Sequence, residues 1–227
     1  MELLKQDDSL VVCVKPAGAL SPDVPGGVPE LVRAELGDPG ADVRTVHRLD
    51  RVVGGLMVLA RSAESASRLS AQVRDGTFEK EYLAVIHWRP HAPAGVFTDL
   101  LTRDPGERKT YVTDRRGPDV REAKLTYETL DSRQGMSLVR VHLITGRTHQ
   151  IRAQFSARGL PLVGDRKYSR LPDECPIALW SFRIGFRHPA TGEQLTFVRQ
   201  PPAIYPWTLF AERLTPGDDR RTENGVS

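Results

Sequence analysis

Residues 47–60 read HRLDRVVGGLMVLA: a polar tetrapeptide that ends in an acid precedes an apolar run at 54–60. The five apolar residues at 56–60 predict a buried strand, and loops held by packed strands are where catalytic groups concentrate. Asp50 is therefore a candidate catalytic acid, and His47 and Arg48 could bind phosphate or steady that acid. By itself, however, such a tetrapeptide is more often a surface turn with a local ion pair than a functional site.

Four further blocks make the pattern much more specific. They are KPAG at 15–18, KEY at 80–82, TGRTHQIR at 145–152 and GLPLVGD at 159–165. In order and spacing, these blocks and the HRLD tetrapeptide resemble the RluA-type family of RNA pseudouridine synthases, from about residue 11 to about residue 202. One departure is visible at 51–55, which read RVVGG where much of the family has Asp-Thr-Ser-Gly after the acid.

The resemblance implies a fold and an activity. The fold would be α+β, the pseudouridine synthase fold, with a long bent mixed and largely antiparallel sheet around a central RNA-binding cleft. The activity would be the isomerisation of specific uridines to pseudouridine in structured RNA, either rRNA or tRNA, without a cofactor. The catalytic domain would begin almost at once, at Val11, with no S4-type RNA-binding module before it.

The isomerisation breaks the N1–C1′ bond, rotates the base and joins C5 to C1′, and a single carboxylate can serve it by covalent attack or by taking the C2′ proton. That acid must be ionised while buried under a base, which requires a nearby cation. The resemblance implies Asp50 as the acid, Arg152 as the cation and Tyr82 as a ring that stacks on the target uracil. Arg147 competes with Arg152 for the pairing, and Tyr82 could instead be a strand core residue.

The predicted RNA-binding residues are Arg48, His47, Lys15, Arg147 and His149. The resemblance implies that Arg48 enters the stack where the flipped nucleotide leaves it. Arg147 lies at the entrance of a predicted helix, where contacts to backbone phosphates are natural, and a fixed turn would present Lys15. Neither histidine belongs to a cluster with metal-ligand spacing, so we predict no metal and no cofactor.

The composition indicates an ordinary soluble protein. The 227 residues are 39% hydrophobic and 27% charged, and we expect a single catalytic domain at 1–213 and a disordered tail at 214–227. Cys13 and Cys175 form no Cys-x-x-Cys pair, and no signal peptide or membrane-spanning run is present. We therefore expect a cytoplasmic protein with no membrane partner, and we also expect a monomer.

The charge is unevenly distributed along the chain. The net charge is only +3, but residues 140–190 carry nine Lys or Arg against three acids, whereas residues 1–50 carry five against nine. A local basic excess of this kind indicates a phosphate-binding face. The alternative is a solvated basic helix without a partner.

Periodicity and turn residues predict the elements in outline. Strands are expected at 11–14, 56–60, 78–88, 123–130, 137–143, 177–186 and 194–198. Helices are expected at 30–36, at 62–74 with Ser62 as its cap and Gly76 as its end, and at 148–158. Residues 99–117 are expected to form a hairpin or a mobile loop. Strands outnumber helices without βαβ alternation, which favours the α+β class.

Two other functions remain alternatives. The first is an RNA-binding or RNA-chaperone protein that kept the fold and lost turnover, which the presence of Asp50, Tyr82 and Arg152 disfavours. The second is a metal-dependent hydrolase built on His47 and Asp50, which the lack of further ligand pairs disfavours.

Overall fold

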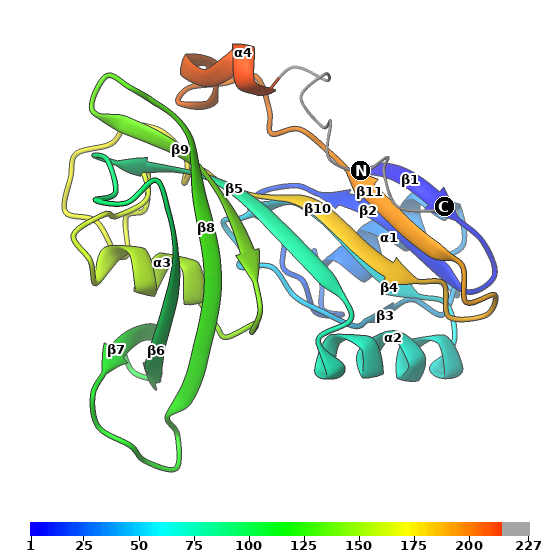
Figure 1. The fold of residues 1–227 in the computed structure, drawn as a ribbon. Coiled ribbons are helices and arrows are strands. Elements are labelled where there is room, and N and C mark those ends of the chain that lie inside the picture. Colours follow the sequence, from blue (N-terminus) through cyan, green and yellow to red (C-terminus); the bar gives the residue numbers. More distant parts are fainter. Residues whose placement is uncertain (215–227) are drawn as a thin grey trace, which may run out of the picture.

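The computed structural model describes residues 1–214, and its main feature is one 11-stranded sheet (Figure 1). The strands follow the order β1-β2-β4-β10-β5-β9-β8-β6-β7, with β11 paired to β10 and β3 paired to β4. Their bounds are β1 Glu2–Gln6, β2 Leu10–Lys15, β3 Arg44–Thr45, β4 Gly54–Ala60, β5 Glu79–His87, β6 Ala94–Asp104, β7 Lys109–Thr113, β8 Arg121–Arg133, β9 Met136–Leu143, β10 Leu179–Arg187 and β11 Gln194–Val198.

The sheet is mixed. Within residues 1–214 the strand pairs are antiparallel except β4 with β10, where Gly54 and Gly55 lie beside Trp180 and Ser181. Gly55 has φ +117°, and a Cβ there would lie 2.4 Å from the carbonyl oxygen of Ser181, so the close approach of these two strands requires glycine. The predicted α+β class with a mixed, largely antiparallel sheet is confirmed.

Helices begin and end where local chemistry allows. They are α1 Val28–Leu36, α2 Ala63–Asp75, α3 Gln150–Ser156, the 3-10 helix η1 Trp207–Phe210 and α4 Ala211–Leu214. The hydroxyl of Ser62 accepts the N–H of Ser65 at the start of α2, and Gly76 closes it in the left-handed conformation, both as predicted. In the described part of the chain no helix is long and apolar enough to cross a membrane.

Hydrophobic clusters hold the helices on the sheet. α1 and α3 share the first cluster, in which Val32 and Phe155 pack with residues of β2, β4, β5 and β9. Leu69 of α2 packs in the second, against β2, β4 and β10. Trp207 and Phe210 of η1 pack in the third, against β5 and β10. α1 and α2 lie beside β2 and β4, α3 lies beside β6 and β7, and β5 runs between these two parts of the sheet (Figure 1).

Several predictions of secondary structure need correction. The short strands β1 and β3 and the terminal pair η1–α4 were not expected, because they are too short to show periodicity. Residues 99–117 contain a hairpin, formed by the second half of β6 and by β7. α3 begins later than predicted because His149 has φ +55°, which is outside the helical region, and it ends at Ser156, two residues before the predicted end. The predicted disordered tail at 214–227 lies outside the described residues, apart from Leu214.

Candidate active site

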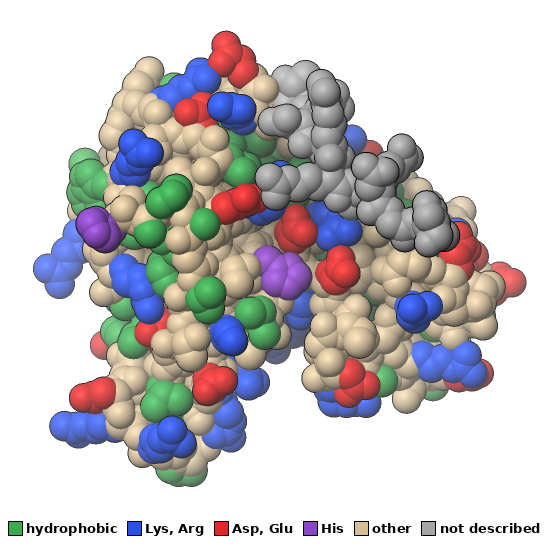
Figure 2. Space-filling model, viewed as in Figure 1, with side chains coloured by type: hydrophobic (Ala, Val, Ile, Leu, Met, Phe, Trp, Pro, Cys, Tyr) green, Lys and Arg blue, Asp and Glu red, His purple; other side chains and the backbone are tan. Residues whose placement is uncertain are grey.

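A cleft of about 1790 Å³ opens between α2 and the β6–β7 hairpin. In Figure 2 the molecule is hollowed between the two lower lobes that carry these elements. Eight Lys and Arg residues line the cleft and are exposed: Arg48, Arg51, Arg74, Arg103, Arg108, Arg147, Arg166 and Lys167. Three acids line it, and two of them, Asp50 and Asp165, are paired with Arg152. The cleft is therefore strongly positive, as a site for a polyanion must be.

The loop that carries Asp50 is braced from both sides. The hydroxyl of Ser21 donates to the carbonyl of Leu49 at 2.8 Å and accepts the Leu49 N–H at 3.0 Å. The carbonyl of Asp50 accepts the N–H of Val53 at 3.0 Å. Since β4 begins one residue later and is buried throughout, the carboxylate stands on a short loop anchored to the core. Its side chain is 21% exposed, so a substrate in the cleft can reach it.

Lys15 is part of this bracing. Its side chain is completely buried, and the ammonium donates to the carbonyls of Pro16, Arg51 and Val53 at 3.0, 3.2 and 2.7 Å. Burial lowers the pKa of Lys15 to about 8, although the charge of Asp50 opposes this. The predicted contact of Lys15 with RNA does not fit this placement, because all three donors already serve the loop. Lys15 holds the backbone on the carboxyl side of Asp50.

His47 is also placed differently from the prediction. The ring is 8% exposed, its Nε2 accepts the N–H of Val58 at 3.1 Å, and it packs on Phe78 at 5.1 Å between centroids. Burial, with the nearby charge of Lys80, lowers the pKa of His47 to about 3. A buried neutral ring that ties the loop to β4 is a poor phosphate ligand, so the predicted RNA contact of His47 does not fit either.

Arg152 joins two carboxylates. Its Nη1 donates to Asp50 at 3.0 Å, while Nε and Nη2 donate to the two oxygens of Asp165 at 2.8 and 2.7 Å. Burial disfavours the charged guanidinium, but the hydrogen bonds and charge of Asp165, followed by those of Asp50, outweigh this and raise its pKa. A cation held in this way favours the ionised form of a carboxylate beside it. α3 thus brings Arg152 to Asp50, whereas Arg147 lies exposed and donates to the carbonyl of Glu122.

Asp165 binds backbone amides in its own turn. It accepts the N–H groups of Lys167 and Tyr168, at 3.1 and 3.2 Å. It is also 1% exposed and fixes Arg152 through the two-pronged ion pair. The only signal in the sequence was the Gly164-Asp165 turn itself, which does not say which arginine the carboxylate meets.

Tyr82 lies on β5 and contributes both to the core and to the cleft. It is 6% exposed, belongs to the first hydrophobic cluster and lines the cleft together with Asp50. Burial, and then the charge of Asp50, raise the pKa of Tyr82, so its hydroxyl stays protonated at neutral pH. Tyr82 is therefore both a core residue of the strand and a ring that a substrate in the cleft can contact.

Tyr168, which sequence reasoning did not select, connects the cleft wall to the β6–β7 hairpin. Its hydroxyl accepts the N–H of Thr110 at 2.7 Å and forms a hydrogen bond with Nδ1 of His149 at 2.9 Å. The guanidinium of Arg152 lies 5.0 Å from the centroid of its ring. Because Nε2 of His149 is 3.7 Å from Asp50, one tyrosine links the hairpin to the surroundings of the acid.

We expect Tyr168→Phe to lower the free energy of unfolding by about 1–3 kcal/mol, because the N–H of Thr110 loses its acceptor while the ring contacts remain. Urea unfolding measures this change. Tyr205→Phe is the matched control, since Tyr205 is 50% exposed and, within the described part of the chain, its hydroxyl contacts only the sulfur of Met136, at 3.8 Å. Equal stabilities of the two variants would show that the link to the hairpin has no energetic weight.

The remaining predicted residues lie at the rim or beside the acid. Arg48 and Arg147 are exposed and line the cleft, and His149 is half-buried next to Asp50. Burial is the main cause that lowers the pKa of His149, with opposing contributions from Asp50 and Arg152. Within residues 1–214 there is no group of three His, Cys, Asp or Glu side chains that could hold a metal.

Comparison with known proteins agrees with this geometry. A protein of Aquifex aeolicus named as an RNA pseudouridine synthase is 29% identical over 91% of this chain and 72% of its own length. Ribosomal large subunit pseudouridine synthase C of Haemophilus influenzae is 30% identical over 86% of this chain and 64% of its own length. The solved structure of human RNA Pseudouridylate Synthase Domain Containing 4 superposes with a TM-score of 0.77 at 26% identity, and covers 94% of this chain and 93% of that one. Residues 9–157 match the family described as RNA pseudouridylate synthase, and the chain belongs to that family.

Proposed function

We propose that this protein converts a uridine of large-subunit ribosomal RNA to pseudouridine, with Asp50 as the catalytic acid. The observation that carries the proposal is the Asp50–Arg152 pair at the floor of a basic cleft. The choice of RNA is supported by the relatives from Haemophilus influenzae and Zymomonas mobilis, both named as ribosomal large subunit synthases. We place the reaction in the cytoplasm and expect the protein to act as a monomer without a cofactor.

The residues around Asp50 suit this isomerisation. The carboxylate either attacks the nucleoside or removes the C2′ proton, and in both routes it must start ionised, which the guanidinium of Arg152 favours. Tyr82 offers a ring face to the uracil, and Arg48 stands at the mouth of the cleft where a flipped nucleotide would leave its stack. After C5 has joined C1′, the C5 proton is lost, and the product has the same composition as the substrate.

The direct test uses ribosomal RNA labelled with tritium at C5 of uridine. The protein should release tritium in proportion to the pseudouridine formed, and release should persist in EDTA when the folding of the RNA is controlled separately. Pseudouridine mapping of cells with and without the gene then identifies the position. RNA binding without any release of tritium would favour the catalytically silent RNA-binding alternative, and a modified tRNA position would correct the choice of RNA.

A pair of variants separates phosphate binding from chemistry. Arg147→Ala should weaken RNA binding and flatten the slope of log K against log salt by about 0.7, one contact to single-stranded RNA, because this exposed arginine lies at the rim. Its single-turnover rate at saturating RNA should stay near that of the unmodified protein. Arg152→Ala should bind RNA nearly as well as the unmodified protein and react far more slowly. Because Asp165 loses its ion-pair partner in this variant, the rate is measured below the variant's melting temperature. If the two variants exchange these signatures, Arg147 is the residue that supports the acid.

A further inference from the structure

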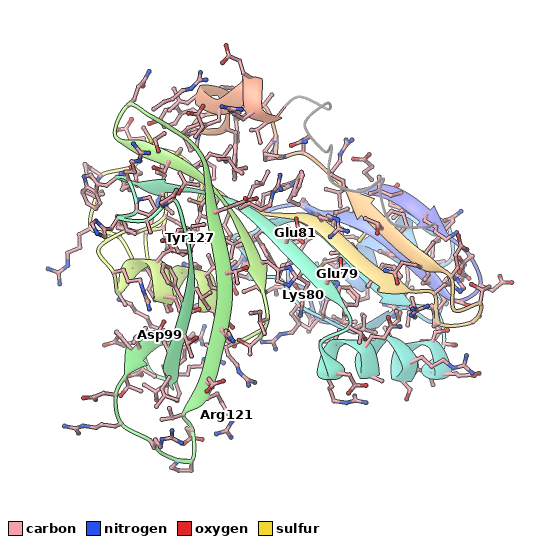
Figure 3. The ribbon with its side chains drawn as sticks, viewed as in Figure 1. Glu79, Lys80, Glu81, Asp99, Arg121 and Tyr127 are labelled. Carbon is pink, nitrogen blue, oxygen red and sulfur yellow. The ribbon has the colours of Figure 1, made fainter. Side chains whose placement is uncertain are left out.

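At the start of β5, Glu79 and Glu81 form ion pairs, whereas Lys80 forms none among the described residues. Alternation along a strand sends neighbours to opposite sides, and Glu79 and Glu81 both bind Arg183, at 2.9 and 3.0 Å. Lys80 lies between them and lines the cleft (Figure 3). The two adjacent acids are therefore already used by Arg183, on the other side of the strand, and do not neutralise the ammonium.

The ammonium of Lys80 has no acceptor in the described part of the chain. No hydrogen bond and no carboxylate within 4.0 Å is found for it among residues 1–214, and its one contact of note is the ring of Phe78, 5.8 Å away at the centroid. Burial lowers its pKa. Lys15 shows the contrasting case, because its buried ammonium binds three carbonyls. A half-buried cation without a partner destabilises the free protein, which points to a role in binding.

His47 supplies no counter-charge to Lys80. Its ring is buried, its Nε2 accepts the N–H of Val58, and burial together with the charge of Lys80 lowers its pKa, so the ring is neutral.

Gly146 lies close beside the ammonium. A Cβ built on Gly146 would lie 3.4 Å from Nζ of Lys80, in van der Waals contact, so a larger residue here would crowd the charge. Gly146 is exposed and lines the same cleft. A glycine at this position therefore leaves the ammonium uncovered on that side.

The position along β5 relates this charge to the target base. Tyr82 is two residues further on, about 6.6 Å along the strand. Both side chains line the cleft, so the ammonium lies along the strand from the ring that would face the target uracil.

We propose that Lys80 binds a backbone phosphate of a nucleotide next to the target uridine, beside Gly146. The proposal rests on the proposed function, because RNA is the polyanion that enters the cleft. Binding supplies the counter-charge that the free protein lacks, so the site recognises the path of the chain rather than the sequence of its bases.

The first test compares Lys80→Met with Lys5→Met in an Asp50→Asn background that does not turn over RNA. Lys5 is a matched control, because it carries the same charge, is paired with Asp7 at 3.6 Å and does not line the cleft. Lys80→Met should flatten the slope of log K against log salt by about 0.7, which is a fivefold loss of affinity at 0.1 M salt. Lys80→Arg should retain the slope. An unchanged slope in Lys80→Met would overturn the proposal.

The second test locates the phosphate. We compare the affinities of the protein with Lys80 and of Lys80→Met for RNAs that each carry one neutral methylphosphonate linkage, placed at successive positions around the target. One neutral linkage adjacent to the target should lower the affinity about fivefold when Lys80 is present. The same linkage should cause no further loss of affinity in Lys80→Met. Additive losses at every linkage would contradict the contact. Unchanged affinity with a slower single turnover of Lys80→Met in the Asp50 protein would instead identify a proton-transfer group and also overturn it.

The melting temperature distinguishes a lysine that binds RNA from one that stabilises the fold. Removal of an unpaired buried charge should leave the melting temperature of Lys80→Met equal to or above that of the unmodified protein. A clear decrease would identify Lys80 as structural and contradict the proposal. These tests measure binding and stability. Failure of the proposed function would instead appear as no tritium release by the unmodified protein, so the two failures can be told apart.

Discussion

Asp50→Asn should fold, bind RNA and release no measurable tritium from C5-labelled uridine. The amide has the shape of the carboxylate but lacks the charge needed for covalent attack or for removal of a C2′ proton, and loss of such a group costs several orders of magnitude in rate. Arg152 keeps its two-pronged pair with Asp165, so the cleft should retain its structure. The measurement is single-turnover tritium release at saturating RNA.

The matched control for this variant is Asp42→Asn. Asp42 is exposed, pairs with Arg44 at 2.8 Å and does not line the cleft, so its neutralisation should leave the rate unchanged. Equal RNA affinity of the Asp50→Asn protein and the unmodified protein establishes that the substrate still binds. Turnover by Asp50→Asn within tenfold of the unmodified rate, about 1.4 kcal/mol of barrier, would remove Asp50 from the mechanism.

Asp165→Asn should lower both stability and rate. Asp165 is 1% exposed, and its replacement leaves the buried guanidinium of Arg152 with only Asp50 as a counter-charge. Breaking a buried ion pair from one side costs about 3–5 kcal/mol, which corresponds to a decrease in melting temperature of about 10 °C for a chain of this size. Because Arg152 then loses the contacts that orient it, the single-turnover rate should also fall, measured well below the melting temperature.

Asp23→Asn is a close control, because Asp23 forms the same two-pronged pair with Arg33, at 2.9 and 2.7 Å, on the surface. Its side chain is 53% exposed, and neutralisation should cost less than about 1 kcal/mol. Urea unfolding of both variants gives the comparison. Equal losses would show that burial adds nothing to the Arg152–Asp165 pair, and a destabilised Asp165→Asn protein with an unchanged rate would show that Asp165 does not position Arg152 for catalysis.

Local chemistry explains why much of the fold was predictable. The boundaries of α2 follow from a serine that accepts a backbone N–H and a glycine that adopts a left-handed conformation, and both interactions span a few residues. The alternation of β5, with Tyr82 and Leu83 in different hydrophobic clusters, was readable for the same reason. α3 was predicted too long because the left-handed conformation of His149 depends on the turn before it.

The sequence by itself determined most of the elements and the α+β class, because periodicity and caps act over short distances, and its resemblance to a known family made Asp50, Tyr82 and Arg152 candidates. Only the tertiary structure decided that β4 lies parallel to β10, that Arg152 meets an acid 102 positions away, and that Asp165 holds the same guanidinium. It also decided that Lys15 is buried under three carbonyls whereas Lys80 lines the cleft without a partner among residues 1–214. A lysine has the same chemistry in both places, and only packing between segments far apart in the chain determines whether its charge is satisfied by the protein or left for a ligand.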